Sequence, residues 1–177
     1  KLVTTTEELV PQGAVVLDVA AGTGELSFAA AKNAEKVTCT DLSMKMLEVA
    51  QRKAKRKNIR NVSFDVRNIF ELKDADESYD VVMAGNVLHL IGNPEKAVEE
   101  LWRVTKKGGK LLLPTFMIKN KSYLIEIYKM LGFRPATNYT PELYCKMLAE
   151  CGLGKVRVKN INGLIPCCYA VIEKPLT

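Results

Sequence analysis

The stretch Val15–Leu26, which reads VVLDVAAGTGEL, decides how this chain folds. It begins with apolar, β-branched residues, as does a strand that is buried on both faces of a parallel sheet. Glycines follow at positions 22 and 24, and helix-forming residues begin at Glu25. The stretch therefore predicts a strand, a tight turn and a helix. Such a turn brings main-chain N–H groups close to a ligand, because glycine has no Cβ to block the approach.

Length and composition predict one globular domain that covers residues 1–177. The chain is 47% hydrophobic and 26% charged, which is ordinary for a folded protein. Its net charge of +6 permits an acidic partner without requiring one. No apolar run approaches the roughly 20 residues of a membrane span, so we expect none.

The cysteines and the single histidine, His89, argue against a metal site. The five cysteines are odd in number and show no CxxC spacing, and zinc sites usually need several such ligands. We expect reduced thiols in a cytoplasmic protein, and no bound metal.

Strands and helices alternate along most of the chain. Strands are predicted at 14–19, 36–41, 62–66, 79–84, 110–116, 155–159 and 167–173, and helices at 24–33, from 43, at 94–105, around 124–131 and at 140–152. One helical turn is expected in the leader 1–13, and a turn at 107–109. The alternation predicts a doubly wound α/β fold with a mostly parallel, seven-stranded sheet. The last two strands are expected to form an antiparallel hairpin at one edge.

Asp41 closes the second predicted strand, seventeen positions after Gly24. A carboxylate at this place can accept hydrogen bonds from both hydroxyls of a ribose, which indicates an adenosine-type ligand. The alternative, which we rank lower, is that Asp41 caps the helix that follows.

The residues around the turn distinguish a dinucleotide from other adenosine ligands. A dinucleotide site expects three glycines, whereas Ser27 stands in the third place here. Asp18, just before the turn, would repel a pyrophosphate but suits a ligand that carries an ammonium or sulfonium group.

Four ordered segments resemble those of class I S-adenosylmethionine-dependent methyltransferases, above all the small-molecule and quinone-type enzymes. They are Val16–Gly24, Asp41–Leu47, Tyr79–Leu90 and Arg103–Leu111. The resemblance implies a Rossmann-like methyltransferase fold. It also implies methyl transfer from S-adenosylmethionine to a small-molecule acceptor by in-line attack.

The resemblance also implies roles for the residues around the turn. Gly22 and Gly24 would pass beneath the methionine part of the cofactor, and Asp18 would help to hold its amino group. Asp41 would bind the ribose hydroxyls. Ala20 replaces the first glycine of the motif, a change that is tolerated if φ stays negative there.

Four further positions would contact the cofactor by the same resemblance. Leu42 would lie against the adenine, Asn68 would meet the adenine amine with Ile69 beside it, and Asn86 would stand at the mouth next to the reacting methyl. Asn68 replaces the aspartate that is common in the family. His89 lies near this mouth and is the candidate general base, although a packing or backbone-bonding histidine is the favoured reading.

Two other functions remain open at this stage. An RNA or protein methyltransferase is permitted by the positive charge, but no strand carries the interleaved aromatics of a base-stacking surface, so nucleic acid is not favoured. A non-catalytic cofactor-binding domain is the other alternative, because only about thirteen residues precede the first strand. Segment 117–145 is expected to form a substrate-side or lid insertion. The acceptor and the oligomeric state are not predicted.

Overall fold

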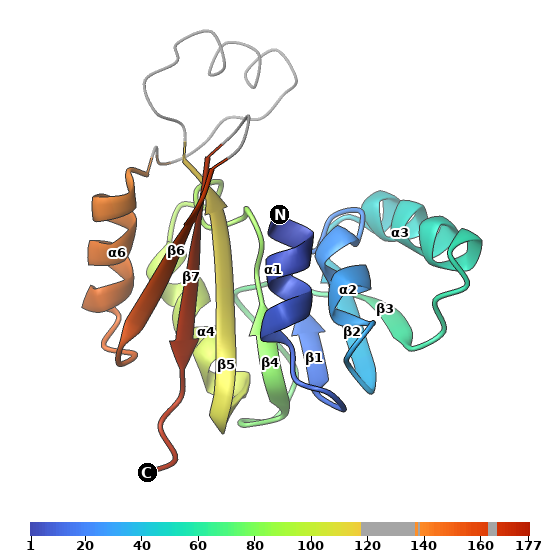
Figure 1. Ribbon diagram of the computed structural model, residues 1–177, viewed down its shortest axis with the longest axis horizontal. Coiled ribbons are helices and arrows are strands. Elements are labelled where there is room, and N and C mark those ends of the chain that lie inside the picture. Colours follow the sequence, from blue (N-terminus) through green and yellow to red (C-terminus); the bar gives the residue numbers. More distant parts are fainter. Residues whose placement is uncertain (118–136, 138, 163–165) are drawn as a thin grey trace, which may run out of the picture.

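Seven strands form one sheet in the computed structural model, which describes residues 1–117, 137, 139–162 and 166–177. The strands are β1 (Val15–Asp18), β2 (Lys36–Asp41), β3 (Val62–Val66), β4 (Tyr79–Met83), β5 (Thr105–Phe116), β6 (Val156–Ile161) and β7 (Cys167–Glu173). Their order across the sheet is β3-β2-β1-β4-β5-β7-β6 (Figure 1). Because β1 lies near the middle and the order reverses beside it, a ligand site is expected at the carboxyl ends of β1 and its neighbours.

Strands β1 to β5 are parallel, and the last two strands complete the sheet as a hairpin. β7 runs antiparallel to both β5 and β6. The antiparallel strand is therefore β7, which lies next to the edge strand β6. The predicted α/β fold with a mostly parallel sheet and a C-terminal antiparallel hairpin is confirmed.

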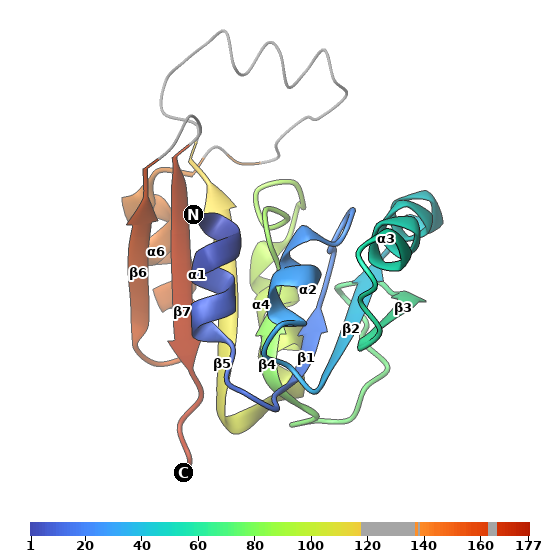
Figure 2. The same cartoon turned by 45° about the vertical axis from the view of Figure 1, so that its right-hand side comes forward.

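Helices cover both faces of the sheet (Figures 1 and 2). They are α1 (Leu2–Leu9), α2 (Glu25–Ala30), α3 (Met44–Arg56), α4 (Pro94–Val104) and α6 (Pro141–Glu150). Leu17 packs in one cluster with side chains of α4 and α6, whereas its neighbour Val16 packs on the α1 and α2 side. This alternation is the period of two expected of a strand that is buried on both faces. α1 covers eight residues, about two turns, where the sequence predicted one.

The turn predicted at 107–109 is wrong. β5 already begins at Thr105, which pairs with Tyr79, and it continues through this region with a shift in register. Gly108 adopts φ +74, which accommodates the irregularity, and its N–H donates to the carbonyl of Lys174 at 2.9 Å. The glycines therefore lie within an irregular part of β5 and not in a turn. Lys174, which follows β7, adds one more hydrogen bond between the two strands.

Segment 117–145 lies mostly outside the described residues, and so does the helix predicted around 124–131. At the end of this segment, Tyr139 and Tyr144 are buried, with ring centroids 5.2 Å apart. The hydroxyl of Tyr144 donates to the carbonyl of Leu113 at 2.9 Å, which fixes α6 to β5.

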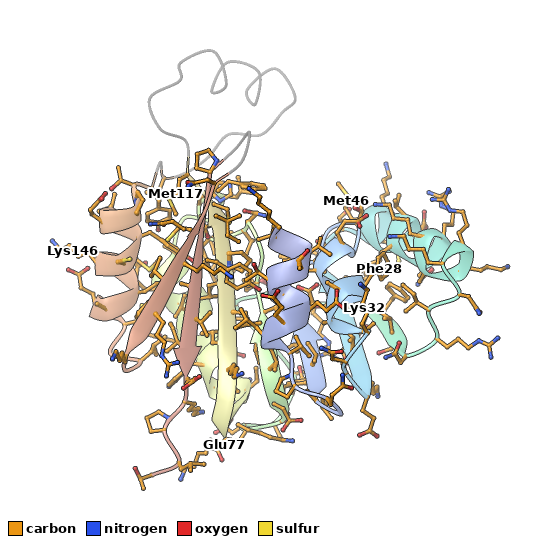
Figure 3. The ribbon with its side chains drawn as sticks, viewed as in Figure 1. Phe28, Lys32, Met46, Glu77, Met117 and Lys146 are labelled. Carbon is orange, nitrogen blue, oxygen red and sulfur yellow. The ribbon has the colours of Figure 1, made fainter. Side chains whose placement is uncertain are left out.

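The carboxyl edge of the parallel strands is the upper edge in Figure 3, where Met117 follows β5 and Met46 lies on α3. Glu77, which precedes β4, marks the opposite edge. Within the described ranges, no helix is both long and apolar enough to cross a membrane.

Candidate functional site

The turn after β1 lies open at the carboxyl edge of the sheet. Both of its glycines have positive φ, +56 at Gly22 and +83 at Gly24. A Cβ at Gly24 would lie 2.8 Å from Cζ of Phe28, so a larger residue would displace the Phe28 ring where α2 packs on the turn. A Cβ at Gly22 would meet no atom within 4 Å, which leaves the main chain at this point accessible to a ligand.

Asp41 connects this turn to the end of β2. Its Oδ2 accepts a hydrogen bond from the N–H of Gly22 at 2.8 Å, and its Oδ1 accepts one from the N–H of Ser43 at 2.8 Å. Ser43 is the N-cap residue of α3, so Asp41 also shapes the start of that helix without being its cap. A carboxylate has about four acceptor positions, and two remain for a pair of ligand hydroxyls.

Asp18 is fully buried behind the turn, with a carboxylate that is only half satisfied. Its Oδ2 accepts from the hydroxyl of Ser27 at 2.6 Å, whereas its Oδ1 has no hydrogen-bond partner among the described residues. Burial raises the pKa of Asp18 to about 7, although the hydrogen bonds from Ser27 oppose the shift. An unpaired buried carboxylate oxygen is costly, and a ligand cation beside it would remove that cost. The site therefore fits a ligand with a positive group near the turn.

A small hollow of about 140 Å³ brings two of the predicted residues together, Asp18 and Asn86, whereas the other predicted residues are not among those that line it. It is lined by Asp18, Ala21, Thr23, Glu25, Leu26, Gly85 and Asn86. The turn after β1 and the end of β4 thus share one space, as the sequence predicted for Asp18 and Asn86.

The condition under which Ala20 would be tolerated, a negative φ, is not met, since its φ is +54. Its neighbours fix this conformation: the N–H of Val19 donates to Met83 and the N–H of Ala21 donates to Thr40, both at 2.8 Å. The turn is thereby held between β4 and β2. A residue with a side chain in the left-handed region costs about 1–2 kcal/mol, so Ala20 is strained where the family motif has glycine.

Lys53 is a residue of the site that sequence reasoning missed. Its Nζ donates to Oγ1 of Thr23 at 2.8 Å and to Oε1 of Glu25 at 2.7 Å, so α3 holds the turn from the side. The spacing along the helix could have identified Lys53. It follows buried Ala50 by three positions and precedes buried Ala54 by one, so it lies at the border of the buried face of α3.

The predicted adenine contacts lie in different environments. The Leu42 side chain is 70% exposed, next to Asp41, and offers apolar surface to a flat ring. Asn68 is exposed, and its Oδ1 accepts from the N–H of Phe70 at 3.0 Å. Ile69 is buried in the core on the α4 side, so its side chain stabilises the fold there.

The end of β4 places Asn86 and His89. The Oδ1 of Asn86 accepts from the N–H of Phe116 at 2.9 Å and its own N–H donates to Pro114, so it ties β4 to β5. Nδ1 of His89 is buried and finds no hydrogen-bond partner in the described part of the chain. Burial lowers the pKa of His89, which favours a neutral imidazole.

Comparison with known proteins yields relatives of one kind. A family described as a methyltransferase domain matches residues 11–146. The demethylmenaquinone methyltransferase of Renibacterium salmoninarum is 31% identical over 173 residues, which cover 85% of this chain and 71% of that protein. The ubiquinone/menaquinone biosynthesis C-methyltransferase UbiE of Zymomonas mobilis is 32% identical over 115 residues, 65% of this chain and 48% of that protein. The chain thus spans about half the length of this second relative.

A solved structure extends the likeness to the fold. A SAM dependent methyltransferase from Aquifex aeolicus superposes with a TM-score of 0.73 at 22% identity, over 95% of this chain and 87% of that one. At this identity the likeness concerns the fold alone.

Proposed function

This chain belongs to the methyltransferase domain family, and on that premise we propose that it transfers a methyl group from S-adenosylmethionine to a small-molecule acceptor. The observation that carries the proposal is the placement of two carboxylates around one glycine turn. Asp18 lies behind the turn with one oxygen that has no partner in the described part of the chain, and Asp41 lies beside the turn, bonded to Gly22.

The proposed contacts follow the chemistry of each group. Asp18 holds the amino group of the cofactor, directly or through water, and Asp41 accepts from the ribose hydroxyls. Gly22 and Gly24 allow the methionine part to approach the main chain. When bound, S-adenosylmethionine supplies a methyl group on a positively charged sulfur, which is a good leaving group.

The exposed Leu42 side chain would lie against the adenine, and the Asn68 amide would meet the adenine amine. Ile69 contributes its main chain beside the ring, since its side chain is in the core. Asn86, fixed between β4 and β5, stands at the mouth of the site.

We propose a phenol or hydroquinone ring as the acceptor, because the names of both relatives contain a quinone and one specifies C-methylation. With the cofactor bound, its methyl group would pass to a ring carbon, the electrons of the broken carbon–sulfur bond would stay on sulfur, and the proton displaced from that carbon would leave to water. His89 is the candidate base for the hydroxyl proton that activates the ring. Nδ1 of His89 has no partner among the described residues, and burial lowers its pKa; both support this role, and the competing role is packing.

The proposal extends to the organisation of the chain. Residues 1–177 form a single domain, and segment 117–145 contributes the substrate side of the site. All five cysteines are free thiols, which suits the cytoplasm.

Calorimetry with S-adenosylmethionine tests the cofactor, and transfer of a labelled methyl group to 1,4-naphthohydroquinone tests the acceptor class. We expect binding below millimolar concentration and label in the quinol fraction. A folded sample that gives no heat at millimolar cofactor contradicts the proposal. Binding without transfer to any quinol supports a non-catalytic domain, and transfer to RNA or protein instead supports the other alternative.

His89→Ala separates the two roles of the histidine. As a base, His89 is needed for kcat and for its pH dependence, but not for cofactor affinity. A retained kcat rules the base out and leaves the packing role.

A further inference from the structure

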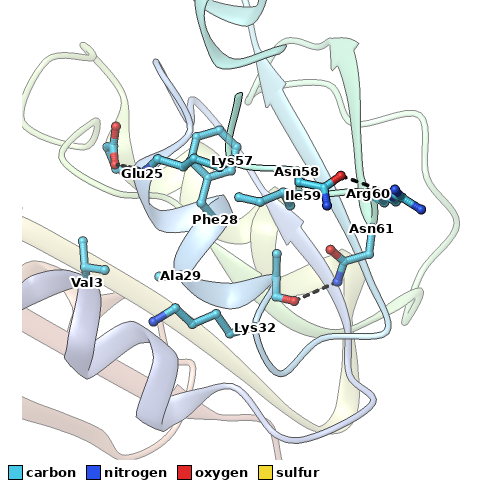
Figure 4. A pocket seen from close by; sticks show the side chains of 11 residues that line it. Val3, Glu25, Phe28, Ala29, Lys32, Lys57, Asn58, Ile59, Arg60 and Asn61 are labelled. Atoms are coloured by element: carbon cyan, nitrogen blue, oxygen red, sulfur yellow. Dashed lines mark hydrogen bonds and ion pairs between the residues drawn. The ribbon is translucent and has the colours of Figure 1, made fainter. Parts of the chain in front are cut away.

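A second hollow of about 570 Å³ lies behind the glycine turn, on the outer side of α2 (Figure 4). Phe28 and Ala29 of α2 form its floor, between Val3 of α1 and Ile59 of the segment after α3. This apolar floor is large enough to accept a ring or a short hydrocarbon body.

The rim of this hollow is cationic. Among the described residues that line it, Lys32, Lys57 and Arg60 are positive and Glu25 is the one carboxylate. Lys32 is bound to Glu7, at 2.7 Å. Lys57 and Arg60 have weaker partners than Lys32, so the rim keeps positive charge that an incoming group could meet.

Lys57 and Arg60 are placed to change partners. Nζ of Lys57 lies 3.7 Å from Glu25 and 5.3 Å from the ring centroid of Phe28, a loose ion pair and a cation–π contact. Among the described residues, Nε of Arg60 donates only to the neutral Asn58, at 3.2 Å. An anion at this rim would bind Lys57 and draw it off the aromatic ring, which would open the floor to an apolar body.

The hollow is physically connected to the cofactor site. Glu25 lines both hollows, and it is held by Lys57 from one side and by Lys53 from the other. Phe28 forms the floor here and also packs against Gly24 so closely that no Cβ fits between them. Movement at Lys57 or Phe28 therefore changes the support of the glycine turn.

We propose that this hollow is a binding site for a small anion with an apolar or aromatic body, and that its occupancy changes cofactor affinity through Glu25 and Phe28. The anion binds Lys57, Arg60 adds positive charge at the other end of the hollow (Figure 4), and the body lies on Phe28 and Ile59. Binding itself is independent of the proposed methyl transfer, whereas the coupling rests on S-adenosylmethionine as cofactor.

Phenyl phosphate is the probe, measured by calorimetry in the absence of cofactor. We expect it to bind more tightly than inorganic phosphate or benzyl alcohol, because only the whole molecule uses both rim and floor. Arg60→Ala and Val3→Glu should each weaken it at least about threefold, and both sites are exposed enough to leave the fold intact. Arg56→Ala is the matched control, since Arg56 is an exposed cation of α3 that lines a different hollow. Equal weakening by all three variants, or no binding at 10 mM probe, overturns the site.

Coupling is tested by titrating cofactor with and without saturating phenyl phosphate. We expect the cofactor Kd to change at least twofold, the probe Kd to change by the same factor when cofactor is added, and Lys57→Gln to abolish the change. An unchanged Kd overturns the coupling and leaves the site. If no cofactor binds at all, the proposed function has failed, and the phenyl phosphate titrations still decide the site.

Discussion

The main-chain N–H of Gly22 donates to Oδ2 of Asp41 at 2.8 Å and thereby joins the turn after β1 to the end of β2. The two residues are nineteen positions apart, and the contact fixes both halves of the candidate site at once. A ligand that lies on the turn must therefore pass beside the Asp41 carboxylate. This relationship makes Asp41 the first residue to test.

Asp41→Ala should weaken S-adenosylmethionine binding by about tenfold to a hundredfold. Hydrogen bonds to a charged acceptor contribute about 1.5–3 kcal/mol, and the variant also frees Gly22. Calorimetry measures the change. Asp65→Ala is the control, because Asp65 is an exposed carboxylate of β3 that pairs with Arg67. Unchanged affinity in Asp41→Ala would remove this residue from the site.

Ala20→Gly should stabilise the protein by up to about 1.6 kcal/mol. Glycine removes the left-handed strain of about 1–2 kcal/mol, and its greater freedom in the unfolded chain takes back about 0.4–1 kcal/mol. Urea unfolding measures the difference. Ala21→Gly is the matched control: the neighbouring residue is not among those with positive φ, so this change should destabilise. A loss of stability in Ala20→Gly would contradict the strain at this position.

Lys53→Met should weaken cofactor binding severalfold and leave the protein folded. The methionine keeps an apolar stem but releases Thr23 and Glu25, which both line the hollow at the turn. The hydrogen bond from Lys53 is the main cause that lowers the pKa of Glu25, so the variant should raise that pKa again. NMR titration of Glu25 and calorimetry give the two readings.

Lys55→Met, on an exposed position of the same helix, controls for the loss of one positive charge. Equal cofactor affinity in both variants would mean that Lys53 acts only through net charge. Equal affinity in Lys53→Met and the parent protein would mean that the turn holds its shape without it.

The elements and the order of the site residues followed from local patterns, because strand and helix periods are properties of neighbouring residues. The glycine turn and the positions of Asp18 and Asp41 could be predicted for the same reason. The position of Ile69 could be predicted only for its main chain, which follows β3. Its side chain lies in the core, which the sequence did not indicate.

The features that the sequence did not reveal depend on contacts between distant segments. The positive φ of Ala20 is imposed by hydrogen bonds to Met83 and Thr40, which lie on two other strands. Lys53 reaches a turn thirty positions earlier in the chain. The bulge at Gly108 is set by pairing with β4 and by the segment after β7. No local spacing encodes these partners.

Asp18 should give the protein a pH dependence opposite to that of most carboxylates. Its pKa in the folded protein is about 7, because burial raises it from 3.8. Between these two values the folded protein binds more protons than the unfolded chain. The contribution of Asp18 to stability is therefore complete below about pH 4 and is lost as the pH rises through 7, with a steepest slope of about 1.4 kcal/mol per pH unit.

Urea unfolding of the cofactor-free protein from pH 5 to pH 8 measures this slope, and Asp18→Asn should remove it because the amide does not titrate. Ser27→Ala is the complementary variant: it removes the hydrogen bond that favours the charged carboxylate, so the loss of stability should extend to higher pH. Cofactor affinity should show the reverse trend and increase up to and beyond pH 7, since a cationic amino group binds the charged form. An identical pH slope in Asp18→Asn and the parent protein would mean that Asp18 is already charged when buried, and its unsatisfied oxygen would then need another partner.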